Sequence, residues 1–308
     1  MNDLNWERSC PPKTVSPGAL TKVLQSYRAG AVVCALTPVS VGCRNSNFVL
    51  QTEREKLFLR LTDSASNNER AAWSLLHESV RMPQLLSEGE LDGSYFLLYG
   101  YAEGLSLQQH INTAGSCSPE IAAQAARMAA RLHSLDPALM ASVNVFTPPP
   151  FATWYDLFLK NPLVQDALGG PLIARVRKML MREEEAIQKI SAEPSVPIHA
   201  DFRPANMLID AAGQICITDW ESFGLGHALG DVGQFFRFRK QFGPAAMHAF
   251  ETVYNAEAAR PLPENWERLA LLRDLVNPLQ MLGRSWDAPR AKADLLELVR
   301  CTLDQLDA

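Results

Sequence analysis

The sequence has no long apolar run. No segment approaches the ~18 consecutive apolar residues that a membrane-spanning helix needs. The polar start, MNDLNWERSC, is not followed by an apolar stretch of the kind found in secretory signals. We therefore expect a cytoplasmic protein that does not associate with a membrane.

Cysteine pairs and zinc-ligand clusters are also absent. The six cysteines are scattered along the chain: Cys10, Cys34, Cys43, Cys117, Cys216 and Cys301. They form no C-x-x-C pair, and no histidines cluster at zinc-ligand spacing. This pattern is typical of reduced cytosolic thiols, and it argues against a disulfide scaffold or a zinc module.

Basic residues are not in excess. The net charge is −5 and the pI is near 5.7, whereas nucleic-acid binders need concentrated Lys and Arg. We therefore expect no nucleic-acid partner. A hydrophobic content of 47% and a charged content of 20% are ordinary for a globular protein. A chain of 308 residues suits one large domain or two lobes.

One segment, residues 196–231, gathers several polar side chains: VPIHADFRPANMLIDAAGQICITDWESFGLGHALGD. His199 and Asp201 stand two residues apart, and Asn206 follows five residues after Asp201. Asp219 comes thirteen residues after Asn206. The segment thus offers two carboxylates and a carboxamide within a short stretch of chain.

We expect a β-hairpin directly after Asn206. Residues 207–209 and 215–217 are apolar and strand-like, and residues 210–213 supply turn residues. The hairpin brings Asp219 back beside the loop that carries Asp201. The polar groups of the segment therefore converge on one small volume.

This set of side chains suits phosphoryl transfer. Asn206 and Asp219 offer hard oxygen donors for Mg²⁺, which prefers one or two protein ligands together with substrate phosphates. Asp201 would stand opposite them and accept the proton of an attacking hydroxyl. Because such transfer is largely dissociative, the base mainly orients the hydroxyl and takes its proton late.

The segment resembles the signature of the aminoglycoside phosphotransferase and choline kinase superfamily. That signature reads roughly H-G-D-x-x-x-x-N followed by I-D-W-E, and this sequence has H-A-D-F-R-P-A-N and then T-D-W-E. Ala200 replaces a usual Gly and Thr218 replaces a usual Ile. Neither departure removes a chemical group that the reaction would use.

The resemblance implies a role for each polar residue of the segment. Asp201 would be the catalytic base, and His199 would support the loop that carries it. Asn206 and Asp219 would be the metal ligands. Asp231 would tie the loop to a following helix. ATP and Mg²⁺ are the implied cofactors.

The fold class implied by the resemblance is α+β, a bilobal protein-kinase-like fold. A small N-terminal antiparallel β-sheet lobe with a helix, residues 1–100, would bind the nucleotide. A larger, mainly helical C-terminal lobe, residues 101–308, would carry catalysis and acceptor binding. Local patterns predict strands and helices in the first lobe at residues 16–27, 31–36, 47–51, 56–62, 68–76 and 94–101.

Four residues of the first lobe are candidates for nucleotide binding. The segment G-C-R-N-S-N-F resembles a family loop, which would place Asn45 and Ser46 near phosphates; a plain hairpin turn is the alternative. Arg60 falls where kinases place a phosphate-gripping Lys, although it could be an exposed strand residue. Glu69 would pair with Arg60, or could simply favour the first turn of a helix.

The strand that ends the first lobe is a candidate connector. Tyr99 and Tyr101 belong to an aromatic, apolar stretch that breaks at Ala102-Glu-Gly104. It resembles the family's connector between lobes, whose backbone binds the adenine edge. The alternative is a plain edge strand.

The second lobe is expected to be mostly helical. We predict helices from Ser118 onward and at residues 171–190, 234–241, 245–257, 266–282 and 290–306. His133 in the first of these is expected to be a hydrogen-bonded structural residue.

The last helices would build the acceptor pocket. Aromatic and acidic residues lie in this region: Tyr254, Glu257, Trp266, Glu267, Asp274, Trp286 and Asp287. They could bind a cationic amine, or they could be core aromatics and surface acids.

The leading function is an ATP- and Mg²⁺-dependent phosphotransferase. It would move the γ-phosphate to a hydroxyl of a small molecule, such as an aminoglycoside-like antibiotic, an amino alcohol or a related metabolite. A catalytically silent nucleotide-binding protein of the same fold is the alternative. A protein kinase is disfavoured, because no activation segment of useful length separates Asp219 from Asp231. We expect a monomer or a homodimer.

Overall fold

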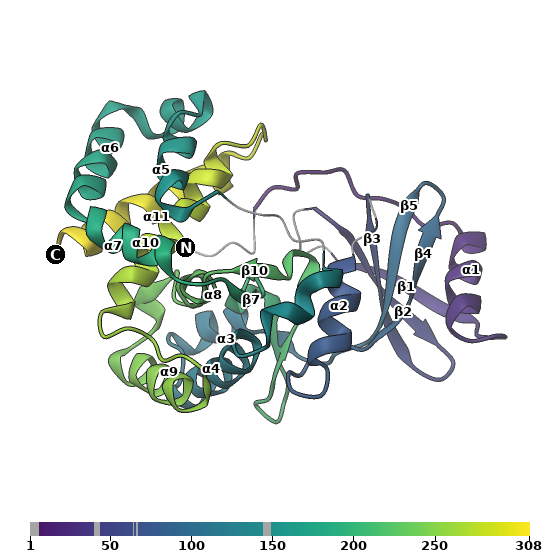
Figure 1. Ribbon diagram of the computed structural model, residues 1–308. Helices are drawn as coiled ribbons and strands as arrows, with labels where there is room; N and C mark the ends of the chain where they lie inside the picture. Colours follow the sequence, from purple (N-terminus) through teal and green to yellow (C-terminus); the bar gives the residue numbers. More distant parts are fainter. Residues whose placement is uncertain (1–5, 40–43, 64, 66, 144–148) are drawn as a thin grey trace.

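The computed structural model describes residues 6–39, 44–63, 65, 67–143 and 149–308. A sheet with a single helix on its outer side forms one end of the molecule, and helices form the other (Figure 1). The buried apolar side chains fall into two clusters, a smaller one in the sheet region and a larger one in the helical region. The predicted α+β fold class is confirmed.

The sheet is five-stranded and antiparallel, with strand order β1-β2-β3-β5-β4. Its strands are β1 (Val33–Val39), β2 (Ser46–Thr52), β3 (Lys56–Thr62), β4 (Leu85–Leu91) and β5 (Ser94–Gly100). Side chains alternate along β2 between buried and half-buried positions, as a strand with one face on a core requires. Strand β4 was not expected from the sequence.

Helix α1 (Pro17–Tyr27) packs against the core of the sheet through Leu20, Val23 and Leu24. Its start is set locally, because the Ser16 hydroxyl accepts the backbone N–H of Ala19 at 3.2 Å and a proline opens the first turn. The predicted helix at residues 16–27 is therefore confirmed.

Helix α2 (Asn67–Leu76) is joined to the larger core. Its Ala71, Ala72 and Leu76 are buried in the cluster of the helical region, and the sheet has a separate cluster. Glu69, in the first turn of α2, is buried as well. The helix thus lies between β3 and β4 in the sequence but packs with the helical part of the molecule.

The helical part contains nine α-helices among the described residues. They are α3 (Leu107–Ala114), α4 (Pro119–His133), α5 (Phe151–Leu159), α6 (Pro162–Arg182), α7 (Glu184–Ala192), α8 (Ala228–Phe235), α9 (Pro244–Glu257), α10 (Trp266–Leu282) and α11 (Pro289–Asp307). Helix α4 packs along α9, and α10 packs along both α8 and α11. The core of this part lies between these helices.

Two predicted helices have wrong bounds. The helix expected at residues 171–190 belongs to two helices, α6 and α7, which meet at Glu183. Glu183 leaves the helical conformation and is buried, and it accepts hydrogen bonds from Arg182 and Arg268. The helix expected at residues 234–241 ends at Phe235 as α8, and a separate 3₁₀ turn, η5 (Arg239–Gln241), follows it.

Short strands position the central segment. Strand β8 (Met207–Ile209) pairs with β9 (Ile215–Ile217), which confirms the predicted hairpin, and β6 (Leu105–Ser106) pairs with β8. Strand β7 (Val196–Ile198) pairs with β10 (Gly224–Gly226). The turns between these strands carry the polar side chains of the segment.

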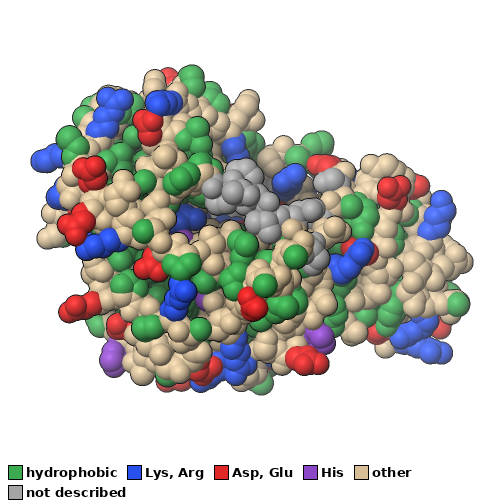
Figure 2. Space-filling view, viewed as in Figure 1, with side chains coloured by type: hydrophobic (Ala, Val, Ile, Leu, Met, Phe, Trp, Pro, Cys, Tyr) green, Lys and Arg blue, Asp and Glu red, His purple; other side chains and the backbone are tan. Residues whose placement is uncertain are grey.

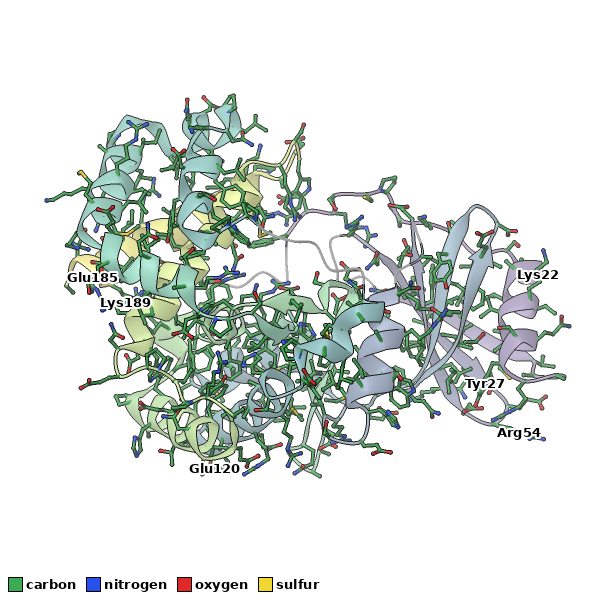
Figure 3. All side chains as sticks on the ribbon, viewed as in Figure 1. Lys22, Tyr27, Arg54, Glu120, Glu185 and Lys189 are labelled. Carbon is green, nitrogen blue, oxygen red and sulfur yellow. The ribbon has the colours of Figure 1, made fainter. Side chains whose placement is uncertain are left out.

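Figure 3 shows charged side chains at both ends of the molecule. Lys22 and Arg54 lie at the sheet end, whereas Glu185 and Lys189 of α7 lie at the helical end. Glu185 and Lys189 form an exposed ion pair of 2.8 Å one helical turn apart. Among the described residues, no helix combines the length and the apolar character needed to cross a bilayer.

Candidate active site

A cavity of about 300 Å³ lies between the sheet and the helical part. Val49 and Phe58 of the sheet line one side, and Leu208 of β8 lines the other. Its walls are largely apolar, with a few polar groups, as is usual for sites that bind small molecules.

The connector between the two parts lines the same cavity. Tyr99, Tyr101 and Ala102 all belong to its wall. Gly104, at φ +142°, crosses directly over β8: a Cβ there would lie 2.6 Å from the carbonyl oxygen of Ile209. Only glycine allows this close crossing, which holds the connector against the hairpin.

Arg60 joins the sheet to the helical part. Its Nη1 donates to Glu69 Oε1 of α2 and to Asp219 Oδ1, each at 2.7 Å. The predicted ion pair with Glu69 is therefore present, and the exposed-strand alternative is wrong because Arg60 is only 7% exposed. Arg60 lines the cavity, so its guanidinium is placed to meet a ligand there.

Acidic side chains outnumber basic ones around Arg60. Burial lowers the pKa of Arg60, but Asp219 and Glu69 more than offset this and raise it. Burial raises the pKa of Glu69 to about 7, against the effect of Arg60 and with the help of Asp219 and Glu221. One guanidinium thus faces three carboxylates.

The turn after β7 is held by a buried carboxylate. Asp231 of α8 accepts the backbone N–H of His199 at 2.8 Å and that of Ala200 at 2.9 Å. Ala200 has φ +64°, in the left-handed region that favours glycine. This conformation explains why a glycine is usual at that position in the motif the segment resembles.

His199 is fully buried and uses both of its ring nitrogens within the protein. Nδ1 accepts the backbone N–H of Asp201 at 3.2 Å, so the ring proton lies on Nε2, which donates to the Thr218 carbonyl at 3.0 Å. Its ring packs on Trp220 with centroids 4.5 Å apart. His199 therefore connects the Asp201 turn to the end of β9.

The carboxylate of Asp201 is held by two side chains. Arg203 donates from Nε to Oδ1 at 2.5 Å and from Nη2 to Oδ2 at 2.8 Å, and Asn206 Nδ2 donates to Oδ2 at 2.7 Å. Burial acts to raise the pKa of Asp201, but the Arg203 guanidinium lowers it to about 2. The side chain is 30% exposed, so a further group can approach this ionised carboxylate.

Asn206 and Asp219 both line the cavity, at adjacent points of the hairpin. The backbone carbonyl of Asn206 accepts two hydrogen bonds from Thr218, one from its backbone N–H at 2.8 Å and one from its side-chain hydroxyl at 3.0 Å. Asn206 Nδ2 donates to Asp201, so the oxygen Oδ1 is the atom left for a cation. Asp219 has left-handed backbone geometry, φ +67° and ψ +57°.

Asn45 and Ser46 lie at the edge of the site. Asn45 Nδ2 donates to Glu221 Oε2 at 2.8 Å and does not line the cavity. Ser46 is buried and its hydroxyl accepts the backbone N–H of Lys13 at 2.8 Å, while the next residue, Asn47, lines the cavity. Other residues of this predicted phosphate loop, at positions 42–43, lie outside the described residues.

A family model described as "Phosphotransferase enzyme family" matches residues 35–272. The chain belongs to this phosphotransferase family.

Solved structures of family enzymes have a similar fold. A protein of Ralstonia eutropha JMP134, proposed to be an aminoglycoside phosphotransferase, has a TM-score of 0.70 at 16% identity, over 96% of this chain and 99% of that one. A thermostable mutant of aminoglycoside phosphotransferase APH(4)-Ia has a TM-score of 0.68 at 17% identity, over 94% and 97%. Spectinomycin phosphotransferase APH(9)-Ia has a TM-score of 0.66 at 13% identity, over 97% and 99%. No curated protein matches the sequence significantly.

Several side chains that hold the site together were missed by sequence reasoning. In this member of the phosphotransferase family, Gln234 Oε1 accepts the backbone N–H of Phe202 at 2.8 Å, and its Nε2 donates to the Ala200 carbonyl at 3.0 Å. Arg203 was also missed, although it stands within the motif. Its position two residues after Asp201 is the signal that could have identified it.

His133 is a hydrogen-bonded structural residue, as predicted. Its Nε2 lies 3.2 Å from Asp231 Oδ2, and its Nδ1 lies 2.8 Å from the hydroxyl of Tyr254. Both histidine and tyrosine are buried. The network extends the support of the turn that carries Asp201 into the core between α4 and α9.

Five of the seven aromatic and acidic residues considered for an acceptor pocket lie in the core or have basic partners, whereas Trp286 donates to the Arg8 carbonyl and Asp287 is exposed. Tyr254 and Trp266 are buried in the core. Asp274 pairs with Arg237, Glu257 pairs with Arg127 and Glu267 pairs with Arg239. The alternative of core aromatics and surface acids is therefore correct for the two aromatics, and the three acids already have basic partners.

Proposed function

We propose that the chain is an ATP- and Mg²⁺-dependent phosphotransferase that acts on a hydroxyl of a small molecule. The observation that carries this proposal is the position of Asp201: ionised, partly exposed, and hydrogen-bonded to Asn206, which itself lines the cavity with Asp219. Family membership supports the reaction class. The proposed nucleotide site lies between the predicted lobes, residues 1–100 and 101–308.

Solved structures of similar fold support both ligands. The APH(4)-Ia structure is a complex with ADP and hygromycin B, and the APH(9)-Ia structure is a complex with ADP and spectinomycin. In each, a nucleotide and a second small molecule are bound to one protein. We assign the cavity lined by Tyr99 and Tyr101 to the nucleotide and the region beyond Asp201 to the acceptor.

The donor set fits a magnesium ion. Among the described residues, no group of three or more His, Cys, Asp or Glu side chains could hold a metal by itself. Mg²⁺ prefers one or two protein oxygens completed by phosphate oxygens and water. Asn206 Oδ1 and the Asp219 carboxylate would hold the ion, which neutralises phosphate charge when bound.

In the proposed reaction the acceptor hydroxyl oxygen attacks the γ-phosphorus of ATP. The O–H proton passes to a carboxylate oxygen of Asp201, and the bond to the β–γ bridging oxygen breaks to release ADP. Although Arg203 and Asn206 bind both oxygens of Asp201, a carboxylate accepts up to about four hydrogen bonds, so a place remains for the hydroxyl. Arg60 would hold phosphate oxygens in the cavity.

The test is the Asp201→Ala variant in an ATP-consumption assay over hydroxyl compounds of negative, zero and positive charge. We expect turnover to fall by ~10²-fold or more, the usual loss for a general base, while calorimetry shows unchanged ATP binding. Equal turnover would remove Asp201 from the role of base. If the wild-type protein binds ATP but consumes none with any compound, the silent nucleotide-binding alternative is correct.

A further inference from the structure

Arg273 of α10 is a buried arginine with an unused donor. It is 8% exposed, and its Nη1 is buried with no hydrogen-bond partner among the described residues. Its guanidinium lies against two rings of α5, with Cζ 5.2 Å from the centroid of Phe151 and 4.8 Å from that of Trp154. The rings cover the guanidinium, and Nη1 is the donor that the described residues leave for another group.

The neighbouring carboxylate does not satisfy Arg273. Asp274 accepts Arg237 Nη2 at 2.7 Å and Nε at 2.9 Å, and also Asn277 Nδ2 at 2.8 Å. Burial lowers the pKa of Arg273 in spite of the raising effect of Asp274. An arginine remains charged at neutral pH, so a buried positive charge with an incomplete set of partners is left at this point.

Arg273 packs against α8, next to the residue that holds the Asp201 turn. A Cβ at Gly230 of α8 would lie 3.4 Å from Arg273 Nη2, and the next residue, Asp231, holds the backbone of Ala200. Arg273 and Arg203 are both absent from the wall of the nucleotide cavity. Both basic groups therefore lie outside the nucleotide cavity, and Arg203 contacts Asp201, where the acceptor hydroxyl would bind.

Three of the four acids that could have bound a cationic acceptor are already engaged, and the fourth, Asp287, is exposed. Asp274, Glu257 and Glu267 each pair with an arginine. In Figure 2, Lys and Arg atoms lie in the recess between the part that carries α5 and α6 and the part that carries α8 and α9. Basic groups at this recess would suit an anion, and not the cationic amine that was one of the two alternatives drawn from the sequence.

We propose that the acceptor carries an oxyanion, a carboxylate or a phosphate group, in addition to its hydroxyl, and that Arg273 binds this oxyanion beside Phe151 and Trp154. The inference rests on the proposed function, because it names the substrate class of that same site. A planar guanidinium held by its faces presents its N–H edge to two oxygens at once, which favours carboxylate and phosphate over other anions.

The test measures binding by calorimetry without nucleotide. The probes are D-glycerate and glycerol 3-phosphate, with glycerol as the neutral control and 2-amino-1,3-propanediol as the cationic control. D-gluconate, D-glucitol and D-glucamine form a second series of larger size. We expect the wild-type protein to bind at least one oxyanion probe and neither the neutral nor the cationic compounds, and the carboxylate and phosphate arms show which group is preferred.

Two variants locate the binding. Arg273→Gln should weaken oxyanion binding by about tenfold or more, because it removes the positive charge and the paired N–H donors of the guanidinium. Arg300→Gln, which removes a positive charge from the exposed surface of α11, should leave binding unchanged. Circular dichroism and ATP binding check that the variants fold. If Arg273→Gln does not fold, Arg273→Lys, which keeps the charge, replaces it.

The outcomes separate this inference from the proposed function. Loss of oxyanion binding in the Arg273 variant alone supports the inference, even if no probe is phosphorylated. Equal oxyanion binding by the Arg273 variant overturns it. The absence of any oxyanion binding also overturns it. Tighter binding and faster phosphorylation of the amines would overturn it too, but the phosphotransferase function would then stand.

Discussion

Arg203 donates to both carboxylate oxygens of Asp201, from Nε to Oδ1 at 2.5 Å and from Nη2 to Oδ2 at 2.8 Å. Two residues of the same turn thus form a forked ion pair at the proposed reaction centre. The pair lowers the pKa of Asp201 to about 2 from an ordinary 3.8, against the effect of burial. Asp201 is therefore ionised throughout the physiological pH range.

The first prediction concerns the pH dependence of Arg203→Met. Without the guanidinium, the largest influence that opposes burial is lost, so the pKa of Asp201 should rise. Turnover of the wild-type enzyme should show no acid limb from Asp201 above pH 5. The variant should show a loss of turnover at acid pH whose midpoint lies closer to neutral pH. The measurement is kcat from pH 4.5 to 8. A wild-type profile in the variant would show that Arg203 does not control the base.

The second prediction concerns stability. Asp231→Asn should lower the free energy of unfolding by about 3 kcal/mol or more, because an NH₂ group then faces the buried N–H groups of His199 and Ala200. Urea unfolding measures the change. Asp287→Asn, at an exposed position, is the matched control and should change stability by less than about 0.5 kcal/mol. Equal midpoints for the two variants would contradict the structural role of Asp231.

The third prediction concerns the proposed metal site. Asp219→Asn should weaken Mg²⁺-dependent ATP binding by about tenfold or more, because a neutral amide is a poorer magnesium ligand than a carboxylate. Binding of ATP without Mg²⁺ should change much less. Calorimetry with and without Mg²⁺ distinguishes the two effects. An identical loss in both conditions would mean that Asp219 acts only through its pairing with Arg60.

The fourth prediction concerns the packing of α8 on α10. A Cβ at Gly233 would lie 2.6 Å from the Ala270 carbonyl oxygen and 2.9 Å from Asp274 Cβ, so Gly233→Ala should cost about 1–3 kcal/mol of unfolding free energy. Gly18→Ala in α1, with nothing within 4 Å, is the control and should be neutral or slightly stabilising. A neutral Gly233→Ala would show that the two helices can separate without loss.

The local parts of the site could be predicted from the sequence, because short spacing fixes them. The hairpin at residues 207–217 brings Asn206 and Asp219 to the same cavity, as the turn residues indicate. The pairing of Arg60 with Glu69 followed from the resemblance and is present.

Features that depend on distant contacts could not be predicted. Strand β4 was missed because its two glutamates and Gly89 obscure the alternation of a strand, and its pairing with β5 decides its conformation. The start of α8 was missed because His227 caps it through Nδ1, and histidine is not a usual capping residue. The arginine partners of the acids in the last helices come from far along the chain, so their sequence positions gave no sign of them.

The placement of α2 has a consequence for dividing the chain. Ala72 and Leu76 are fully buried in the core of the helical part. A fragment that begins at residue 101 would therefore leave an apolar hollow open to water, and a fragment of residues 1–100 would present the matching helix face uncovered. Each half alone should aggregate, and the two should be recovered in soluble form only when they are produced together.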